Sequence, residues 1–276
     1  MIPPKPPRPI VSHPKPQRLT ERSMRMTLVA AFRCRENGIL LCADREENDG
    51  FLKREVDKIY HFDLACKIGI RPNQPYQVFI AGAGPTAILT KASIEIHECL
   101  RDAVDTGVDI LAEHRTLLES ILETTLNSIR SRYVTDRDSA LFLIIIFASA
   151  NAPPLLYQAE ILYQTEGVIL ELKSIYAAQG NGKPISDYLA NRLYKHGLYR
   201  ETLALLAAFI FREAGRSSSG VGLEVDMKLI HEGGKSVRHI GPNYVKELMD
   251  GVPSLEAAIS SYWEGHVRVP DWLKKD

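Results

Sequence analysis

The sequence has no excess of charge of either sign and no hydrophobic run long enough to cross a membrane. Its 34 basic residues balance its 34 acidic residues, so it lacks an overall field that would attract nucleic acid or an anionic membrane. The longest apolar run, residues 140–148, is far shorter than the roughly 20 residues of a membrane-spanning helix. We therefore expect neither a nucleic-acid partner nor a membrane partner.

The sequence also lacks closely paired cysteines and an apolar segment at its N-terminus. Its four cysteines, Cys34, Cys42, Cys66 and Cys99, form no C-x-x-C pair, which favours free thiols in a reducing compartment. The first residues do not provide the apolar core of a secretory signal. These absences predict a cytoplasmic protein.

The familiar catalytic motifs are missing as well. There is no G-x-S-x-G, no H-E-x-x-H and no Walker loop, and "GAGPTA" lacks the third glycine of a dinucleotide-binding turn. The eight histidines are scattered along the chain, in positions more typical of surface or core residues than of metal ligands. No metal ion or organic cofactor is expected.

Residues 1–25 differ in composition from the rest of the chain. Seven of the sixteen prolines fall in the first sixteen residues, and the segment carries six Lys or Arg residues against the single acidic residue Glu21. Proline removes backbone donors, and little apolar surface is available to offset the entropy of ordering. The pattern predicts a disordered basic tail. We favour a propeptide or a start site placed too far upstream over a ligand for an aromatic groove.

Residues 26–276 are expected to form one α+β domain. Strand patterns and helix patterns alternate in groups, with many links between strands short enough for hairpins, which argues against a doubly wound parallel sheet. The first two strands flank Asn37-Gly38, a hairpin signal. We predict two mainly antiparallel sheets stacked face to face and flanked by helix pairs, a four-layer αββα sandwich. The predicted strands are 26–34, 39–44, 56–62, 76–81, 140–148, 155–161, 168–172, 174–178 and 223–231, and the predicted helices lie within 85–104, 108–133, 180–194 and 202–214.

Thr27 stands directly before the first apolar strand and directly after Met26. A threonine at a chain terminus can act as a nucleophile because its own α-amino group serves as the base. A nearby ammonium group would favour the neutral amine, and a carboxylate would orient that ammonium group. Lys58 and Asp44 are the residues that we expect in these two roles. Taken singly, each has an ordinary interpretation: a strand-starting threonine, a solvated strand lysine and a turn aspartate.

The order of several short motifs resembles proteasome β-type subunits and their bacterial relatives, the N-terminal-nucleophile hydrolases. These motifs span about residues 26–240, almost the whole predicted domain. They are "MTLVAAFRCRENGILLCADREENDG", "KREVDKIY", "FIAGAGPTA", "YAAQGNGKPISDYLANRLY" and "SSSGVGLEVDMKLI".

The resemblance implies a role for each matching residue. Thr27 matches the nucleophile, Asp44 the carboxylate and Lys58 the activating lysine. Gly82 matches the position at the substrate cleft whose N–H supplies the oxyanion hole, and Ser219 matches a serine that supports the terminal amine.

Three departures from the family pattern affect the expected site. The spacing from Thr27 to Asp44 is one residue longer than usual. Asn181 stands where the family often has serine, and it still offers hydrogen bonds near the amine. Arg216 replaces an expected aspartate and cannot accept a hydrogen bond. These departures bear on catalytic efficiency more than on the fold.

The resemblance implies a threonine peptidase that cleaves peptides or unfolded proteins inside a homo-oligomeric ring. Two alternatives stay open: a non-catalytic structural subunit of similar fold, and an N-terminal-nucleophile hydrolase that acts on a small amide. No pattern in the sequence indicates the ring size, the cleavage specificity or an ATPase regulator. Catalysis requires removal of residues 1–26. We predict that the functional chain begins at Thr27, since Met26 suits removal as an initiator better than self-cleavage.

Overall fold

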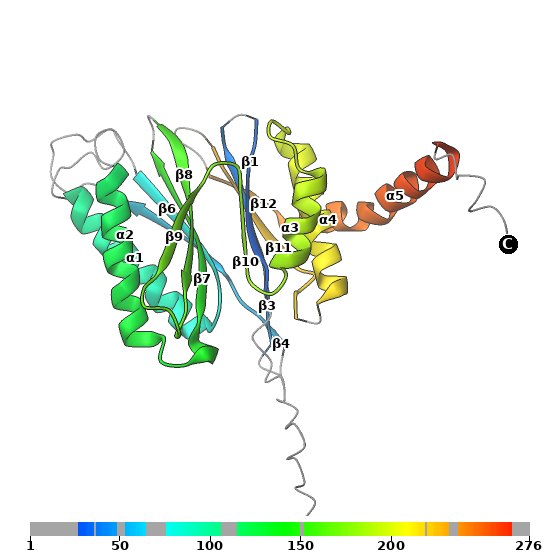
Figure 1. The fold of residues 1–276 in the computed structure, drawn as a ribbon. Coiled ribbons are helices and arrows are strands. Elements are labelled where there is room, and N and C mark those ends of the chain that lie inside the picture. Colours follow the sequence, from blue (N-terminus) through cyan, green and yellow to red (C-terminus); the bar gives the residue numbers. More distant parts are fainter. Residues whose placement is uncertain are drawn as a thin grey trace, which may run out of the picture.

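The computed structural model describes residues 27–35, 37–48, 53–64, 76–105, 115–149, 152–218, 220–231 and 237–266. In these residues two five-stranded antiparallel sheets stack face to face, and helices cover both outer faces (Figure 1). The predicted four-layer α+β sandwich is confirmed.

The first sheet has the strand order β10-β1-β2-β11-β12, with every neighbouring pair antiparallel. The predicted hairpin joins its neighbouring strands β1 and β2. Asn37 adopts a positive φ of 55°, which asparagine tolerates better than most residues. The Cys34 N–H donates to the carbonyl oxygen of Gly38 at 2.9 Å and closes the turn. The strands of this sheet are β1 (Val29–Arg33), β2 (Ile39–Asp44), β10 (Tyr176–Gln179), β11 (Val225–Ile230) and β12 (Val237–Ile240).

The second sheet runs β5-β6-β7-β8-β9 in chain order, again with antiparallel pairing throughout. A separate two-stranded ribbon, β3-β4, lies between β2 and β5 in the sequence. The strands are β3 (Glu46–Asn48), β4 (Lys53–Glu55), β5 (Ile59–Leu64), β6 (Tyr76–Ala83), β7 (Leu141–Ser149), β8 (Ala152–Ile161) and β9 (Ile169–Lys173).

Helices α1 and α2 cover the second sheet, whereas α3 and α4 cover the first (Figure 1). Helix α1 buries Leu89, Ala92, Ile96 and Leu100, a spacing of three and four residues that places them on one face. The helices are α1 (Thr86–Asp105), α2 (Arg115–Tyr133), α3 (Lys183–Leu193), α4 (Arg200–Ser217) and α5 (Pro242–His266), and Arg137–Ser139 form a 3-10 turn. No helix among the described residues is long and apolar enough to cross a membrane. The cytoplasmic location stays a prediction.

The core consists of three apolar layers. Along β1, Val29 and Ala31 face the second sheet, while Ala30 and Phe32 face the helices. Because successive strand residues point to opposite faces, β1 contributes to two layers at once. All six residues of β2 are buried for the same reason. The site described below lies at the ends of these rigid strands.

The structure adds elements that the sequence pattern did not predict, namely β3, β4, β12 and α5. The ribbon β3-β4 is highly charged, so it has no alternation of apolar and polar residues. Helix α5 contains Gly251 and Pro253, which obscure its helical pattern. The tail at 1–25 and the start of the helix predicted from residue 108 lie outside the described residues.

Candidate active site

Three predicted residues come together at one end of the sandwich. Thr27 lies just before β1, Asp44 ends β2 and Lys58 lies just before β5. Pairing of β1 with β2 brings Thr27 next to Asp44, and the Asp44 N–H donates to the carbonyl oxygen of Leu28 at 3.0 Å. Lys58 reaches them from the second sheet. The stacking of the two sheets therefore completes the cluster.

The side chains of the cluster are in direct contact. Lys58 Nζ donates to Thr27 Oγ1 at 2.5 Å and to Asp44 Oδ1 at 2.7 Å. The Thr27 hydroxyl also donates to Asp44 Oδ1. A third bond runs from Lys58 Nζ to the carbonyl oxygen of Glu46, at 2.5 Å. All three donors of the ammonium group are thus satisfied, which fixes its position beside the threonine hydroxyl.

Burial dominates the electrostatics of this cluster. The exposed fractions are 3% for Thr27, 0% for Asp44 and 6% for Lys58. Burial raises the pKa of the Asp44 carboxyl above its usual value, whereas Lys58 and the hydrogen bonds from Lys58, Thr27 and Gly222 lower it in part. A buried ion pair of this kind makes each partner dependent on the other, since loss of one leaves an uncompensated charge.

A glycine turn between β10 and α3 holds the backbone of Thr27. The Gly182 N–H donates to the carbonyl oxygen of Thr27 at 3.3 Å. Gly180 has a φ of +95°, and a Cβ atom built there would lie 2.3 Å from the same carbonyl oxygen. Both the dihedral angle and the close approach require glycine. This turn fixes the direction of the chain on the C-terminal side of the threonine.

Gly82 lies near the end of β6, and its N–H donates to the carbonyl oxygen of Lys58 at 3.3 Å. The structure therefore connects Gly82 to the cluster through the backbone of Lys58. Its predicted role as an oxyanion donor stays a prediction, and it requires the Gly82 N–H to exchange this long bond for a substrate oxygen.

The remaining predicted residues are less closely tied to the cluster. Asn181 lies half-buried in the glycine turn, and its side chain makes no hydrogen bond with the residues that the structure describes. Ser219 lies outside the described residues. Arg216 is 48% exposed in the last turn of α4, where its Nη1 forms an ion pair with Glu213 at 2.8 Å.

Two residues at the site were not predicted from the sequence. The Gly222 N–H donates to Asp44 Oδ2 at 2.9 Å, and Glu46 supplies the carbonyl oxygen that Lys58 contacts. Gly222 belongs to the "SSSGVG" turn, whose composition indicates a turn but not its partner. Glu46 contributes its backbone carbonyl oxygen, which every residue has, so its residue type does not indicate this contact. Among the described residues, no group of three His, Cys, Asp or Glu is placed to hold a metal ion.

Similarity to known proteins is found in structure and not in sequence. No family model matches the chain, and no curated protein matches it. Solved structures of Anbu proteins have a similar fold. Anbu from Hyphomicrobium sp. strain MC1 is 18% identical with a TM-score of 0.64, and the match covers 89% of this chain and 100% of that one. Anbu from Yersinia bercovieri, described as an ancestral β-subunit, is 15% identical with a TM-score of 0.65, over 89% and 100% of the two chains. A helical assembly of the Anbu complex from Pseudomonas aeruginosa is 14% identical with a TM-score of 0.62, over 89% and 99%.

These findings correct the family resemblance drawn from the sequence. The assignment to proteasome β-type subunits and their bacterial N-terminal-nucleophile relatives is wrong as stated, because the structures described above are Anbu chains, which are proteasome-like but distinct. The short motifs correspond to the strand ends and glycine turns of the sandwich. They therefore indicated the fold and not the particular family. Identities of 14–18% show the fold alone.

Proposed function

We propose that this protein is a threonine amidohydrolase that cleaves peptide bonds with Thr27 once residues 1–26 have been removed. The observation that carries the proposal is the buried contact of the Thr27 hydroxyl with both Lys58 and Asp44. A solvated strand lysine would have no reason to place its ammonium group against a threonine hydroxyl inside the protein. Residues of a purely structural core are more often apolar at such positions.

The chemistry follows from the roles of the three groups. The Thr27 Oγ attacks the carbonyl carbon of the peptide bond, and the free Thr27 amine accepts the hydroxyl proton. The Lys58 ammonium group favours the negative charge that develops on Oγ, and Asp44 holds Lys58 in place. The amine then delivers its proton to the leaving nitrogen. A water molecule hydrolyses the resulting ester and regenerates the hydroxyl.

The homo-oligomeric part of the proposal is supported by the helical assembly of the similar Anbu complex. We propose that several copies of this chain assemble around the site and restrict access to peptides or unfolded proteins. Compartmentalisation of this kind would explain how a peptidase avoids folded proteins.

The rival function is a structural subunit without catalysis. In the printed sequence Met26 precedes Thr27, so the Thr27 nitrogen is an amide and cannot accept a proton. A chain that keeps this peptide bond has no base for the nucleophile. The two functions therefore differ in one covalent bond.

The test compares a chain produced with Thr27 as its first residue with the full chain. Each is incubated with a mixture of fluorogenic peptides and with a threonine-directed covalent probe, and intact mass locates the adduct. We expect hydrolysis and an adduct on Thr27 only in the shortened chain. The variant Thr27→Ala should lose both signals, while Thr202→Ala, at an exposed threonine of α4, should keep them. A shortened, folded chain that shows neither signal would establish the structural subunit instead.

A further inference from the structure

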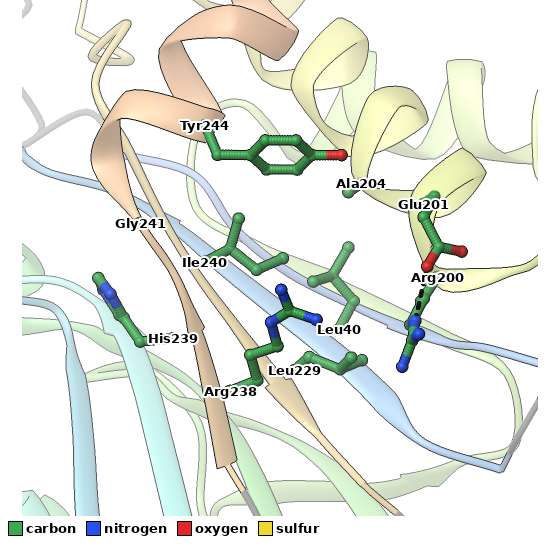
Figure 2. A pocket seen from close by; sticks show the side chains of 10 residues that line it. All are labelled: Leu40, Arg200, Glu201, Ala204, Leu229, Arg238, His239, Ile240, Gly241 and Tyr244. Atoms are coloured by element: carbon green, nitrogen blue, oxygen red, sulfur yellow. Dashed lines mark hydrogen bonds and ion pairs between the residues drawn. The ribbon is translucent and has the colours of Figure 1, made fainter.

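A pocket of about 240 Å³ lies on the helix-covered face of the first sheet, where helices α4 and α5 begin (Figure 2). Its apolar floor consists of Leu40 on β2, Leu229 on β11, Ile240 on β12 and Ala204 on α4. The ring of Tyr244, in the first turn of α5, lies at its edge. The pocket therefore gathers side chains from three neighbouring strands and two helices.

The polar groups of the pocket carry an excess of positive charge. Arg200 Nε pairs with Glu201 Oε1 at 2.7 Å, so this arginine is already neutralised. Arg238 is exposed and makes no hydrogen bond or ion pair with the residues that the structure describes, although its charge acts on the Glu201 carboxylate in the same pocket. Figure 2 shows its guanidinium turned toward the middle of the pocket. Its hydrogen-bond donors thus lie over an apolar floor without an acceptor among the described residues.

His239 does not add to this charge. It follows Arg238 on β12, so its side chain points to the opposite face of the sheet. There its Nε2 lies 2.8 Å from Asp226 Oδ1. With Arg200 and Glu201 paired, the net charge that a ligand meets in the pocket is one positive charge, and its guanidinium donors come from Arg238.

We propose that this pocket binds a small apolar carboxylate. A guanidinium group matches the planar carboxylate with two parallel hydrogen bonds, and the apolar part of the ligand would cover the leucine and isoleucine floor. The volume lies below the roughly 300–1,000 Å³ of pockets that hold drug-sized ligands, which suits a short acid. A single negative charge balances Arg238, whereas a doubly charged phosphate would meet an apolar floor that cannot solvate it.

The pocket is separate from the Thr27 cluster. Leu40 and Asp44 lie on β2 four residues apart, a distance of about 13 Å along a strand. Binding in the pocket therefore does not depend on the proposed peptidase activity. A variant that loses peptide hydrolysis should still bind a ligand in the pocket, and the reverse also holds. The two proposals can therefore be tested on different variants.

A carboxylate with an apolar tail has two sources, a free short-chain acid and the C-terminal residue of a peptide. Hexanoate represents the first, and N-acetyl-leucine represents the second. Both contain the same pair of recognition elements. Whichever of the two binds more tightly identifies the source.

Isothermal titration of the full chain with hexanoate tests the proposal. We expect a dissociation constant of about 1 mM, which is ordinary for a ligand of this size. The uncharged 1-hexanol and N-acetyl-leucinamide should bind at least about tenfold more weakly, because they cannot accept charged hydrogen bonds from Arg238. Equal affinities for hexanoate and hexanol would overturn the proposal.

Substitutions at the arginine provide the second part of the test. Arg238→Gln should weaken hexanoate binding at least about tenfold. Arg238→Lys keeps the charge but loses the paired guanidinium donors, so its affinity should lie between those of the unmodified protein and Arg238→Gln. Arg192→Gln, at an exposed arginine of α3 whose Nη1 contacts the Tyr188 hydroxyl, should leave binding unchanged. Circular dichroism of each variant verifies the fold. Undiminished binding to folded Arg238→Gln, or absence of binding to the unmodified protein, would refute the proposal.

Discussion

The Asp44 carboxylate is the residue on which the whole cluster depends. It accepts hydrogen bonds from Thr27, Lys58 and the N–H of Leu28 through Oδ1, and from the N–H of Gly222 through Oδ2. The sequence predicted the pairing with Thr27 and Lys58, because each residue type suits its chemical role. It could not predict the Gly222 contact, because a backbone N–H is common to almost all residues and only the tertiary fold selects one.

Removal of the lysine should abolish turnover without abolishing the fold. Lys58→Ala in the chain that begins at Thr27 is expected to reduce peptide hydrolysis by about 10²–10³-fold, the usual range for loss of one donor that stabilises developing negative charge. Asp44→Asn should have a similar effect, because it leaves Lys58 without its countercharge. Steady-state hydrolysis and circular dichroism provide the two measurements. Normal hydrolysis by both variants would show that the roles are wrongly assigned.

The same lysine substitution should destabilise the protein in a pH-dependent manner. The folded-state pKa of Asp44 is already raised by burial, and loss of Lys58 removes a group that lowers it. A carboxyl whose pKa is raised by folding contributes stability below its unfolded pKa and loses that contribution as the pH rises through the folded pKa. The destabilisation by Lys58→Ala should therefore be larger at pH 8 than at pH 4.

Denaturant unfolding at the two pH values measures this difference directly. The double variant Lys58→Ala/Asp44→Asn is the control, since it has no carboxyl at this position to titrate. Its free energy of unfolding should therefore change less between pH 4 and pH 8 than that of Lys58→Ala, which keeps the buried carboxyl. A destabilisation by Lys58→Ala that is equal at pH 4 and pH 8 would contradict the electrostatic interpretation.

Gly180 offers a test of how the backbone of Thr27 is positioned. Gly180→Ala would place a Cβ atom 2.3 Å from the Thr27 carbonyl oxygen, whereas Gly197 has the same φ of +95° and no atom within 4 Å of its Cβ position. Both substitutions introduce backbone strain of about 1–3 kcal/mol, but only Gly180→Ala displaces the threonine. We expect Gly180→Ala to label at least tenfold more slowly with the threonine-directed probe and Gly197→Ala to label normally. Equal labelling rates in the two folded variants would remove Gly180 from the site.

At the scale of elements, the sequence predicted the strands that carry the site better than the elements around them. Strands β1 and β2 are apolar and joined by an Asn-Gly turn, so local chemistry defines both ends. The placement of Lys58 beside Thr27 is different in kind, since it arises from stacking of the two sheets and no local pattern encodes it. Helix α5 was missed because Gly251 and Pro253 weaken its local helical preference, and tertiary packing on α4 overrides that weakness.

The burial of β2 predicts the reactivity of its cysteine. Cys42 is fully buried, and burial together with the charge of Asp226 raises the pKa of its thiol well above the usual value. Cys99 is exposed on α1. Because the thiolate is the reactive form, a brief pulse of iodoacetamide should modify Cys99 in the native protein and Cys42 only after unfolding. Peptide mass spectrometry resolves the two sites, and rapid native labelling of Cys42 would show that β2 opens locally.

At the scale of the whole molecule, α5 is the element that packs only in part on the four layers. Its first half packs on α4: Val245 and Val252 are buried, and Arg212 Nη1 donates to the Met249 carbonyl oxygen at 2.7 Å. Its second half extends away from the four layers (Figure 1). A helix segment of this length is marginally stable in water without a packing partner, and in the assembly proposed above a second copy would be that partner.

Truncation of α5 tests this contribution to the proposed assembly. The chain that ends at Val252 keeps the residues packed on α4 and loses only the projecting half, so we expect it to stay folded and to form a smaller particle than the full chain. Multi-angle light scattering measures both masses against the 30.9 kDa of one chain. The substitution Ser254→Ala, at an exposed position of the projecting half, is the control and should leave the mass unchanged, because it removes only one hydroxyl. A full chain with the mass of a single copy would contradict the assembly. Equal masses for the full and truncated chains would place the contacts between copies on the outer helices α1 to α4 instead.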